Sequence, residues 1–205
     1  MHREILSDNQ LELLPLVKEF AREYYLVGGT AIALHIGHRR SIDFDLFKFT
    51  TLRHKSIISK ISAYHYLYTI TRRVTEQLNV TVHNVKFTFY EYPFPIEAKC
   101  KFEGSIKLPE LIDLAGMKAY ALGRRSKWKD YVDLYFILKD YYSIEQISAR
   151  AIEIYGQLFS EKLFRVQLSY FEDIDYTEAI EYLVPPVPED EIREFLIDKA
   201  TEMEL

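Results

Sequence analysis

Residues 24–47, which read YYLVGGTAIALHIGHRRSIDFDLF, leave the chain few ways to fold. The opening apolar run is typical of a short buried strand, and Gly28-Gly29 after it allow a tight turn. The small and apolar residues that follow predict a helix ending at Gly37, because glycine readily adopts the left-handed conformation of a helix C-cap. Residues 41–47 alternate between polar and apolar side chains, which indicates a second strand. The segment therefore predicts a strand, a helix and a strand in close succession.

The second of these strands carries two acids on one face. A period of two places Ile42, Phe44 and Leu46 toward the core, so Asp43 and Asp45 project together from the opposite side. Two neighbouring carboxylates repel each other unless a cation lies between them. Mg²⁺ prefers oxygen ligands and retains waters for substrate phosphates, so the pair predicts a Mg²⁺ (or Mn²⁺) site. The competing interpretation is two solvated acids at the end of a strand.

The glycine turn is a candidate phosphate site. A strand, two glycines, a hydroxyl residue and a helix let the backbone approach an anion closely, while the first amides of the helix point at it. Gly28, Gly29 and Thr30 would then hold phosphate, although a glycine pair is more often only a turn. Together with the two acids, the turn predicts a site for a nucleoside triphosphate and its magnesium ion.

The chain as a whole divides into two halves of different pattern. Up to about residue 105 the residues favour a mixed sheet with helices, and after Pro109 they favour helices alone. This predicts an α+β fold with a first domain at 1–105 and a helical second domain at 106–205. The helices expected in the second half are 109–124, 128–140, 144–155, 160–170 and 188–201.

The first half has two further expected helices and a meander. Apolar residues at helical spacing predict a helix at 8–22, and residues 53–62 also favour a helix. From 66 to 92, β-branched and aromatic residues predict strands joined by tight turns. Pro93 and Pro95 are expected to end that sheet.

Composition limits the class of protein. At 205 residues and 48% hydrophobic, the chain is long enough to bury a core. No apolar run approaches the roughly 20 residues that a membrane helix needs, so we expect a cytoplasmic protein that does not bind membranes. Cys100 is the only cysteine, which excludes an internal disulfide and a thiolate-rich zinc site.

The charge of the chain is uneven along its length. Residues 171–205 carry 12 Asp or Glu against Arg193 and Lys199, a net charge of −10, so the total of −5 leaves +5 for residues 1–170. A mildly basic body suits a polyanionic partner. The acidic end could fold back on that body, or it could be a solvated helix face.

Lys118 lies on the apolar stripe of the helix expected at 109–124, together with Leu111 and Leu114. A buried, unpaired ammonium group is costly, so Lys118 needs a carboxylate or a phosphate, unless its side chain extends to the rim.

Two aspartates follow in the next helix. Asp130 lies in the first turn, where an acid stabilises the helix dipole, so structural and functional roles are equal candidates for it. For Asp133 we expect a structural ion pair with Arg124, Arg125 or a neighbouring lysine.

Two stretches carry a family resemblance. The run LVGGTAIALHIGHRRSIDFDLF, within 24–47, resembles the first motif of the nucleotidyltransferase superfamily, and its pattern GGTAxALxxGHRxSxDFDLF is similar to the AbiEii/AbiGii-type toxins of phage-defence and toxin–antitoxin systems. The run LAGMKAYALGRRSKWKDYVDLYFIL at 114–138 resembles a later motif of the same family. The resemblance implies a nucleotidyltransferase-like fold and an enzyme that uses a nucleoside triphosphate (NTP).

The resemblance also implies roles for residues. Catalysis would fall to Asp43, Asp45, Lys118 and Asp130, with the two strand acids as metal ligands. The nucleotide would contact Gly28, Gly29, Thr30, Arg39, Ser41 and Lys118. A basic cluster would bind the acceptor, and its expected members are Arg40, Arg124, Arg125, Lys127 and Lys129. These roles require the glycine turn, the acidic strand and the Lys118 helix to converge on one pocket.

The implied reaction is transfer of a nucleotidyl group to RNA, with tRNA favoured, or to a protein, by a toxin that an antitoxin restrains. A small molecule such as an aminoglycoside is a further acceptor. The rival interpretation is a nucleotide-binding module that has lost catalysis and acts through protein partners. Thr88 favours this rival, because it stands on a later strand where many superfamily members have a third carboxylate, and Glu91 is out of phase.

Overall fold

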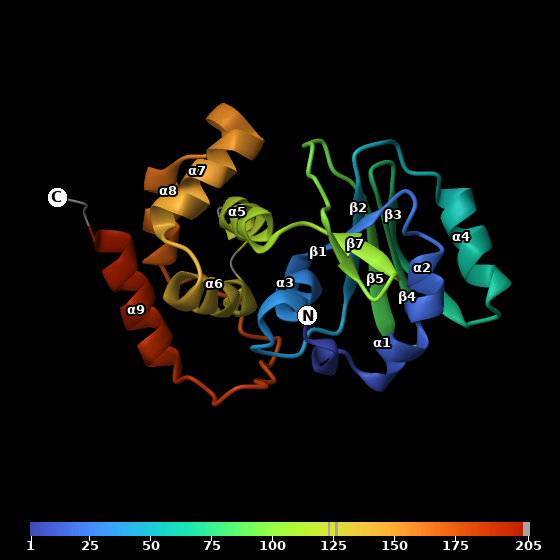
Figure 1. Cartoon of the computed structure of the whole chain (residues 1–205), viewed down its shortest axis with the longest axis horizontal. Coiled ribbons are helices and arrows are strands. Elements are labelled where there is room, and N and C mark those ends of the chain that lie inside the picture. Colours follow the sequence, from blue (N-terminus) through green and yellow to red (C-terminus); the bar gives the residue numbers. More distant parts are fainter. Residues whose placement is uncertain (123, 126, 203–205) are drawn as a thin grey trace. The chain divides into compact units, whose positions relative to one another are not determined.

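The computed structural model describes residues 1–122, 124–125 and 127–202. The chain divides into two compact units, Met1–Glu110 and Leu111–Leu205. Within the described residues the first unit contains a mixed sheet with helices and the second contains helices, so the predicted α+β class is confirmed (Figure 1). Gly123, in the helix expected at 109–124, lies outside the described residues, as do residues 203–205.

The sheet of the first unit has seven strands among the described residues, in the order β3-β4-β5-β2-β1-β7-β6. Two neighbouring pairs, β2 with β5 and β1 with β7, run parallel, and the other neighbours are antiparallel. The strands are β1 (Tyr25–Val27), β2 (Phe44–Lys48), β3 (Tyr68–Val74), β4 (Gln77–Val82), β5 (Val85–Glu91), β6 (Cys100–Phe102) and β7 (Ile106–Leu108).

The last two strands correct the expected end of the sheet at Pro93 and Pro95. β7 pairs in parallel with β1, and β6 pairs with β7. The sheet therefore continues past residue 105, and the division between the units follows Glu110. Three-residue strands are too short to display a period of two, so the sequence pattern does not reveal them.

The helices of the first unit flank the sheet, and one differs from expectation. The single helix expected at 8–22 is two short helices, because Pro15 in the first turn of the second has no N–H to continue the first. Ser7 and Gln10 form a capping box at the start of the first. The elements are η1 (Arg3–Ile5), α1 (Asp8–Glu12), α2 (Leu14–Lys18), α3 (Gly28–Ile36) and α4 (His54–Ala63).

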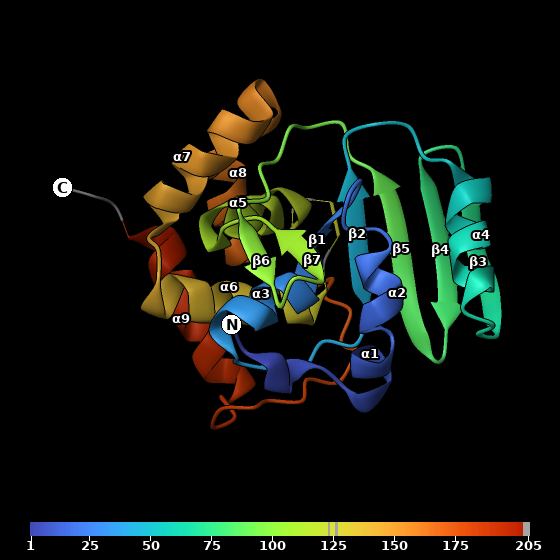
Figure 2. The ribbon, with the colours of Figure 1, turned by 45° about the vertical axis from the view of Figure 1, so that its right-hand side comes forward.

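The two faces of the sheet differ in burial. Figure 2 shows α2 and α4 along one face, and the Phe20 ring just after α2 lies 4.8 Å from the Phe89 ring of β5. In β2, burial alternates: Phe44, Leu46 and Lys48 are buried, whereas Asp45 and Phe47 are half-buried. The predicted inward position of Ile42 is wrong, because this residue precedes the strand and is exposed. One face is thus the core, and the other carries the acids.

β3 is the outermost strand on one side of the sheet. All seven of its residues are exposed, although the strand pairs with β4 along its length. The register shifts between Ile70 and Arg72, which marks a β-bulge or irregularity. The strand therefore adds backbone pairing to the sheet without adding to the core.

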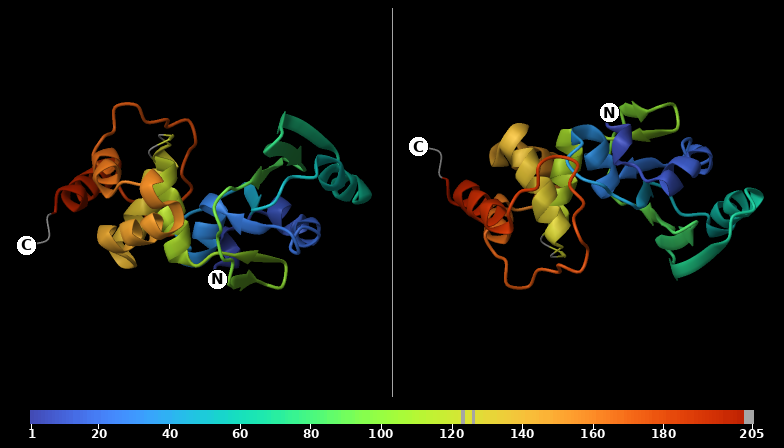
Figure 3. Two further views of the ribbon diagram at one scale, coloured as in Figure 1. Left: turned by 90° about the horizontal axis from the view of Figure 1, so that it is seen from above. Right: turned by 90° about the horizontal axis from the view of Figure 1, so that it is seen from below.

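The second unit consists of helices connected by short turns and one long irregular segment. Gly116 allows α5 to cross α7 closely, since a Cβ there would lie 3.4 Å from the Ala151 backbone nitrogen. The irregular segment between α8 and α9 is drawn in orange in Figure 3. The helices are α5 (Leu111–Leu122), α6 (Trp128–Asp140), α7 (Ile144–Tyr155), η2 (Gly156–Leu158), α8 (Glu161–Leu168) and α9 (Glu189–Thr201). Among the described residues, no helix is long and apolar enough to cross a membrane.

Candidate active site

The glycine turn lies directly against the second acid of the D-x-D strand. Gly28 joins β1 to α3 with φ of +73°, a conformation that glycine adopts without strain. A Cβ at Gly28 would overlap Oδ2 of Asp45. The turn and the Asp45 carboxylate are therefore in direct contact. A residue larger than glycine at position 28 would not fit beside the carboxylate.

The second glycine leaves room for two other predicted residues. A Cβ at Gly29 would lie 2.7 Å from Nη2 of Arg39 and 3.1 Å from the Ser41 hydroxyl oxygen. Arg39 is buried, and its Nη1 donates to the Arg40 carbonyl at 2.8 Å. Among the described residues, no side-chain cap hydrogen bond is present at Val27, the N-cap of α3. A guanidinium, a hydroxyl and the first amides of a helix thus surround the glycine backbone.

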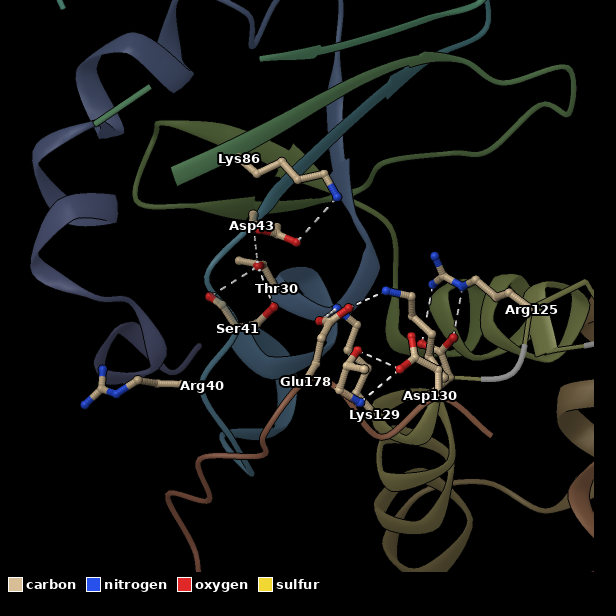
Figure 4. Close-up of polar contacts among 12 residues, drawn as sticks. Thr30, Arg40, Ser41, Asp43, Lys86, Arg125, Lys129, Asp130 and Glu178 are labelled. Atoms are coloured by element: carbon tan, nitrogen blue, oxygen red, sulfur yellow. Dashed lines mark hydrogen bonds and ion pairs between the residues drawn. The ribbon is translucent and has the colours of Figure 1, made fainter. Parts of the chain in front are cut away.

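The Thr30 hydroxyl has partners within the first unit. Its side chain is buried, and its hydroxyl hydrogen-bonds the Ser41 hydroxyl at 2.9 Å and the Asp43 carbonyl oxygen (Figure 4). The hydroxyl is therefore used inside the protein to hold the segment that leads into β2. Only the backbone amide of Thr30 is suited to an anion.

The two acids lie at the start of β2. Asp43 immediately precedes the strand with 26% of its side chain exposed, and its Oδ2 lies 4.0 Å from the ammonium of Lys86 (Figure 4). Asp45 lies within the strand on its half-buried face. Lys86, on β5, is a site residue that the sequence interpretation missed. The sequence feature that could have identified Lys86 is its position on the outward face of β5, a strand that pairs with β2.

The pairing register of the strands also shows which residue lies at the position considered for a third carboxylate. Thr88 of β5 is the direct partner of Asp45 in β2, and Asn79 of β4 is the next partner of Thr88. Glu91 instead pairs with Lys48 at the far end of the strand. Thr88 therefore occupies the position beside Asp45 that the sequence assigned to it.

The donor set fits one magnesium ion shared with a substrate. Among the described residues, no three His, Cys, Asp or Glu side chains gather as a metal cluster. Asp43 and Asp45 supply two carboxylates, and Mg²⁺ commonly takes one or two protein carboxylates and completes its shell with substrate phosphates and waters. The ammonium group of Lys86 is one cation that contacts the Asp43 carboxylate. The chain thus offers a partial shell that a nucleotide would complete.

In the second unit, Lys118 is neutralised within its own unit. Its Nζ lies 2.7 Å from Oδ1 of Asp130 and 2.9 Å from Oδ2 of Asp133, and the lysine is 4% exposed. Arg125 adds a contact of 3.0 Å from Nε to Oδ2 of Asp130 (Figure 4). The rim position considered for Lys118 is wrong. For Asp133 the expected ion pair with Arg124, Arg125 or a neighbouring lysine includes a contact with Lys118, a lysine of the preceding helix.

The ionisation of Asp130 follows from these partners. Burial raises the pKa of Asp130, but the charges of Lys118 and Arg125 outweigh it, so the pKa lies below its ordinary value. A carboxyl group with a lowered pKa is ionised at neutral pH and is a weak proton acceptor. Asp130 is therefore suited to hold Lys118 in place rather than to take a proton.

The expected basic cluster is largely engaged inside the protein. Arg40 donates to the carbonyl oxygens of Glu4 and Leu6, both at 3.2 Å. Arg124 stacks its guanidinium 3.5 Å from the Tyr120 ring centroid. Lys127 and Lys129 both bind Glu178, an acid that the sequence interpretation did not single out.

The chain is similar to known proteins over most of its length. A family model described as "Nucleotidyl transferase AbiEii toxin, Type IV TA system" matches residues 16–204. An uncharacterized protein of Aquifex aeolicus is 29% identical over 207 residues, with 96% of this chain and 97% of that protein covered.

Solved structures share the fold at low sequence identity. The nucleotidyltransferase toxin MenT4 of Mycobacterium tuberculosis aligns with a TM-score of 0.64 and 13% identity, over 94% of this chain and 82% of its own. JHP933 of Helicobacter pylori aligns with a TM-score of 0.57 and 17% identity, over 95% of this chain and 91% of its own. At these identities the likeness concerns the fold.

Proposed function

The chain belongs to the AbiEii nucleotidyltransferase toxin family, and from this premise we propose that it transfers a nucleotidyl group from an NTP to an RNA, with tRNA as the acceptor, in a magnesium-dependent reaction. The family makes it an NTP-using toxin with an antitoxin partner. An enzyme that needs NTP and tRNA would act in the cytoplasm, where both occur.

One observation carries the proposal: the glycine turn lies against the carboxylate of Asp45, the second acid of the D-x-D strand. Gly28 is in contact range of Asp45, and Gly29 lies beside Arg39 and Ser41. A phosphate at the start of α3 would therefore lie next to the carboxylates that hold a metal. This is the arrangement that binding of an NTP with its metal requires.

The chemistry asks for little covalent participation by the protein. The acceptor hydroxyl forms a bond to the α-phosphorus, pyrophosphate leaves, and the hydroxyl proton passes to solvent or to a nearby base. Bound at Asp43 and Asp45, magnesium would neutralise charge on the phosphate oxygens. Arg39 and the amides of Gly28 and Gly29 would bind phosphate oxygens, and positioning would account for most of the rate.

The role of Lys118 in the reaction stays a prediction. Two of its three ammonium hydrogens are directed to Asp130 and Asp133. Binding of a triphosphate oxygen would use the third, and Asp130 would then act as the group that positions Lys118. That Lys118 acts on the nucleotide held by Asp43 and Asp45 also stays a prediction.

The test is transfer of labelled nucleotide to total tRNA in the presence of Mg²⁺. We expect Asp43→Asn and Asp45→Asn each to reduce transfer by more than about 100-fold, because each removes charge aimed at the reacting phosphate. Glu76→Gln is the matched control, since it removes one exposed carboxylate from the β3–β4 turn. Removal of divalent metal with EDTA should abolish transfer.

A second candidate function has one observation in its favour. Thr88 occupies the place of a third carboxylate beside Asp45. If the chain is a nucleotide-binding module, the wild type will bind labelled NTP but will label no RNA, with or without metal. Transfer that disappears in Asp45→Asn and persists in Glu76→Gln would exclude this function.

A further inference from the structure

Glu178 forms ion pairs with the two lysines that flank Trp128 at the start of α6. Its carboxylate accepts from Lys127 and from Lys129 (Figure 4). Burial raises the pKa of Glu178, but these two ammonium groups outweigh it and lower the pKa to about 2. Two ammonium groups converging on one anion are also what binds a nucleic-acid phosphate.

Glu178 belongs to an acidic strap, which we define as residues 171–178, FEDIDYTE. Four of these eight residues are acids. The strap lies along the start of α6, where the Trp128 N–H donates to the Asp175 carbonyl at 3.1 Å. The Tyr176 ring lies 5.3 Å from the Trp128 ring, and Arg193 of α9 donates to the Tyr176 hydroxyl at 2.7 Å. The strap thus covers Trp128, which is 4% exposed.

Charge, more than burial, holds the strap. Its last four residues, Asp175 to Glu178, are all exposed, and the strap has no regular helix. At its other end the half-buried Phe171 ring lies 5.3 Å from the Tyr131 ring, whereas the Tyr176 ring that packs on Trp128 is exposed. Segments with few buried apolar contacts open at low free-energy cost, and exposed ion pairs weaken as salt increases. The Glu178 end can therefore separate while the Phe171 end stays packed.

We propose that the acidic strap covers an RNA-binding surface formed by Lys127, Trp128 and Lys129, and that phosphates of the acceptor RNA displace Glu178 from the lysines. This inference rests on the proposed function, because it takes RNA as the acceptor. The released lysines bind the RNA backbone, and the uncovered Trp128 ring is available to stack on a base. The strap thereby lowers affinity for RNA in the uncomplexed toxin.

The first test compares two strap variants that lose the same charge. Glu178→Gln removes the acid that binds the two lysines. Glu172→Gln removes an exposed acid that accepts a hydrogen bond from the Tyr170 hydroxyl. We expect Glu178→Gln to tighten binding of total tRNA by about fivefold or more, in the range of ordinary coupling between sites. Glu172→Gln should change it by less than about twofold. Equal effects of the two variants would overturn the inference.

The second test uses Trp128, the only tryptophan of the chain, as a reporter of the strap. Addition of heparin, a polyanion without bases, should increase quenching of Trp128 fluorescence by acrylamide in the wild type, whereas tRNA should lower the fluorescence directly, because a base stacks on the uncovered ring. Glu178→Gln should show increased quenching before any polyanion is added. Unchanged quenching on saturation with heparin would contradict the strap model.

The two tests keep this inference separate from the proposed function. If tRNA binding opens the strap but no nucleotide is transferred, then the surface is correct and the proposed reaction is wrong. If transfer to tRNA occurs while Trp128 quenching and both variants match the unliganded wild type, the reaction stands and the strap is a structural element.

Discussion

The two units of the chain differ in how deeply their candidate acids are buried. In the first unit, 26% of the Asp43 side chain is exposed, and its Oδ2 lies 4.0 Å from the ammonium of Lys86. In the second unit, Asp130 and Asp133 are fully buried, with cation contacts of 3.0 Å or less. A ligand can reach the first arrangement from solvent, whereas the second is enclosed together with Lys118. The difference separates a candidate binding site from a cluster that stabilises its own unit.

The largest effect is expected from a variant that breaks the buried ion-pair cluster of Lys118, Asp130 and Asp133. Lys118→Met leaves Asp130 and Asp133 buried without the ammonium group that contacts both, so we expect the free energy of unfolding to fall by about 3–5 kcal/mol. Asp43→Asn removes a half-exposed charge, and it should change that free energy by less than about 0.5 kcal/mol. Urea unfolding followed by Trp128 fluorescence and by circular dichroism measures both. Similar losses in the two variants would show that the two groups of acids are not different in kind.

The next effect concerns the contact between the glycine turn and Asp45. Gly28→Ala should cost about 1–2 kcal/mol of stability, because alanine resists a positive φ. It should also lower nucleotidyl transfer by about 100-fold, because the methyl group displaces the Asp45 carboxylate. Gly104→Ala is the matched control: its φ is +68°, but a Cβ there meets nothing within 4 Å. If both variants lose stability and neither loses transfer, Asp45 is not a site residue.

A smaller effect is expected at Thr30. Thr30→Val removes the hydroxyl that bonds Ser41 and the Asp43 carbonyl, so stability should fall by about 1 kcal/mol with a loss of transfer. Thr30→Ser retains the hydroxyl and should keep most of the transfer activity. Thermal unfolding and the tRNA assay measure the pair. Equal activity in the valine and serine variants would refute the positioning role of this hydroxyl.

The smallest effect is the acid response of the strap. The folded pKa of Glu178, about 2, lies below its ordinary value of 4.5, so its contact with Lys127 and Lys129 is fully present above pH 4.5 and is lost as the pH falls through about 2. Asp175 is the nearby acid, with a pKa that is itself lowered, first by its bond to Thr177. Acrylamide quenching of Trp128 should therefore rise only in this range. In Glu178→Gln the rise should be absent.

Local signals predict well the strands and the helix that carry the candidate site in the first unit. Residues 24–47 form β1, α3 and β2 as expected, because glycine, period-two and apolar signals agree there. Thr88 also lies beside Asp45, since an alternating strand fixes which side chains share a face. The hydroxyl of Thr30 could not be assigned, because the sequence does not show that it bonds backbone atoms of a later segment.

The second unit shows where sequence reasoning stops. The helix patterns at 128–140 and 144–155 match α6 and α7. The partners of Lys118 and the contact of Glu178 with Lys127 depend on how segments far apart in the chain pack, and no local periodicity encodes this. The net charge of residues 171–205 indicated that the acidic end could fold back, but it did not identify the acid that does so.

The outer strand β3 has a consequence for how the protein behaves at high concentration. An exposed strand edge is a template on which another chain can add a strand and begin aggregation. Arg72 and Arg73, being adjacent, project a positive charge from each side of β3, and the register shift next to them distorts the edge. A second copy that approached this edge would meet like charges on both sides. The chain can thus expose all of β3 and still resist polymerisation.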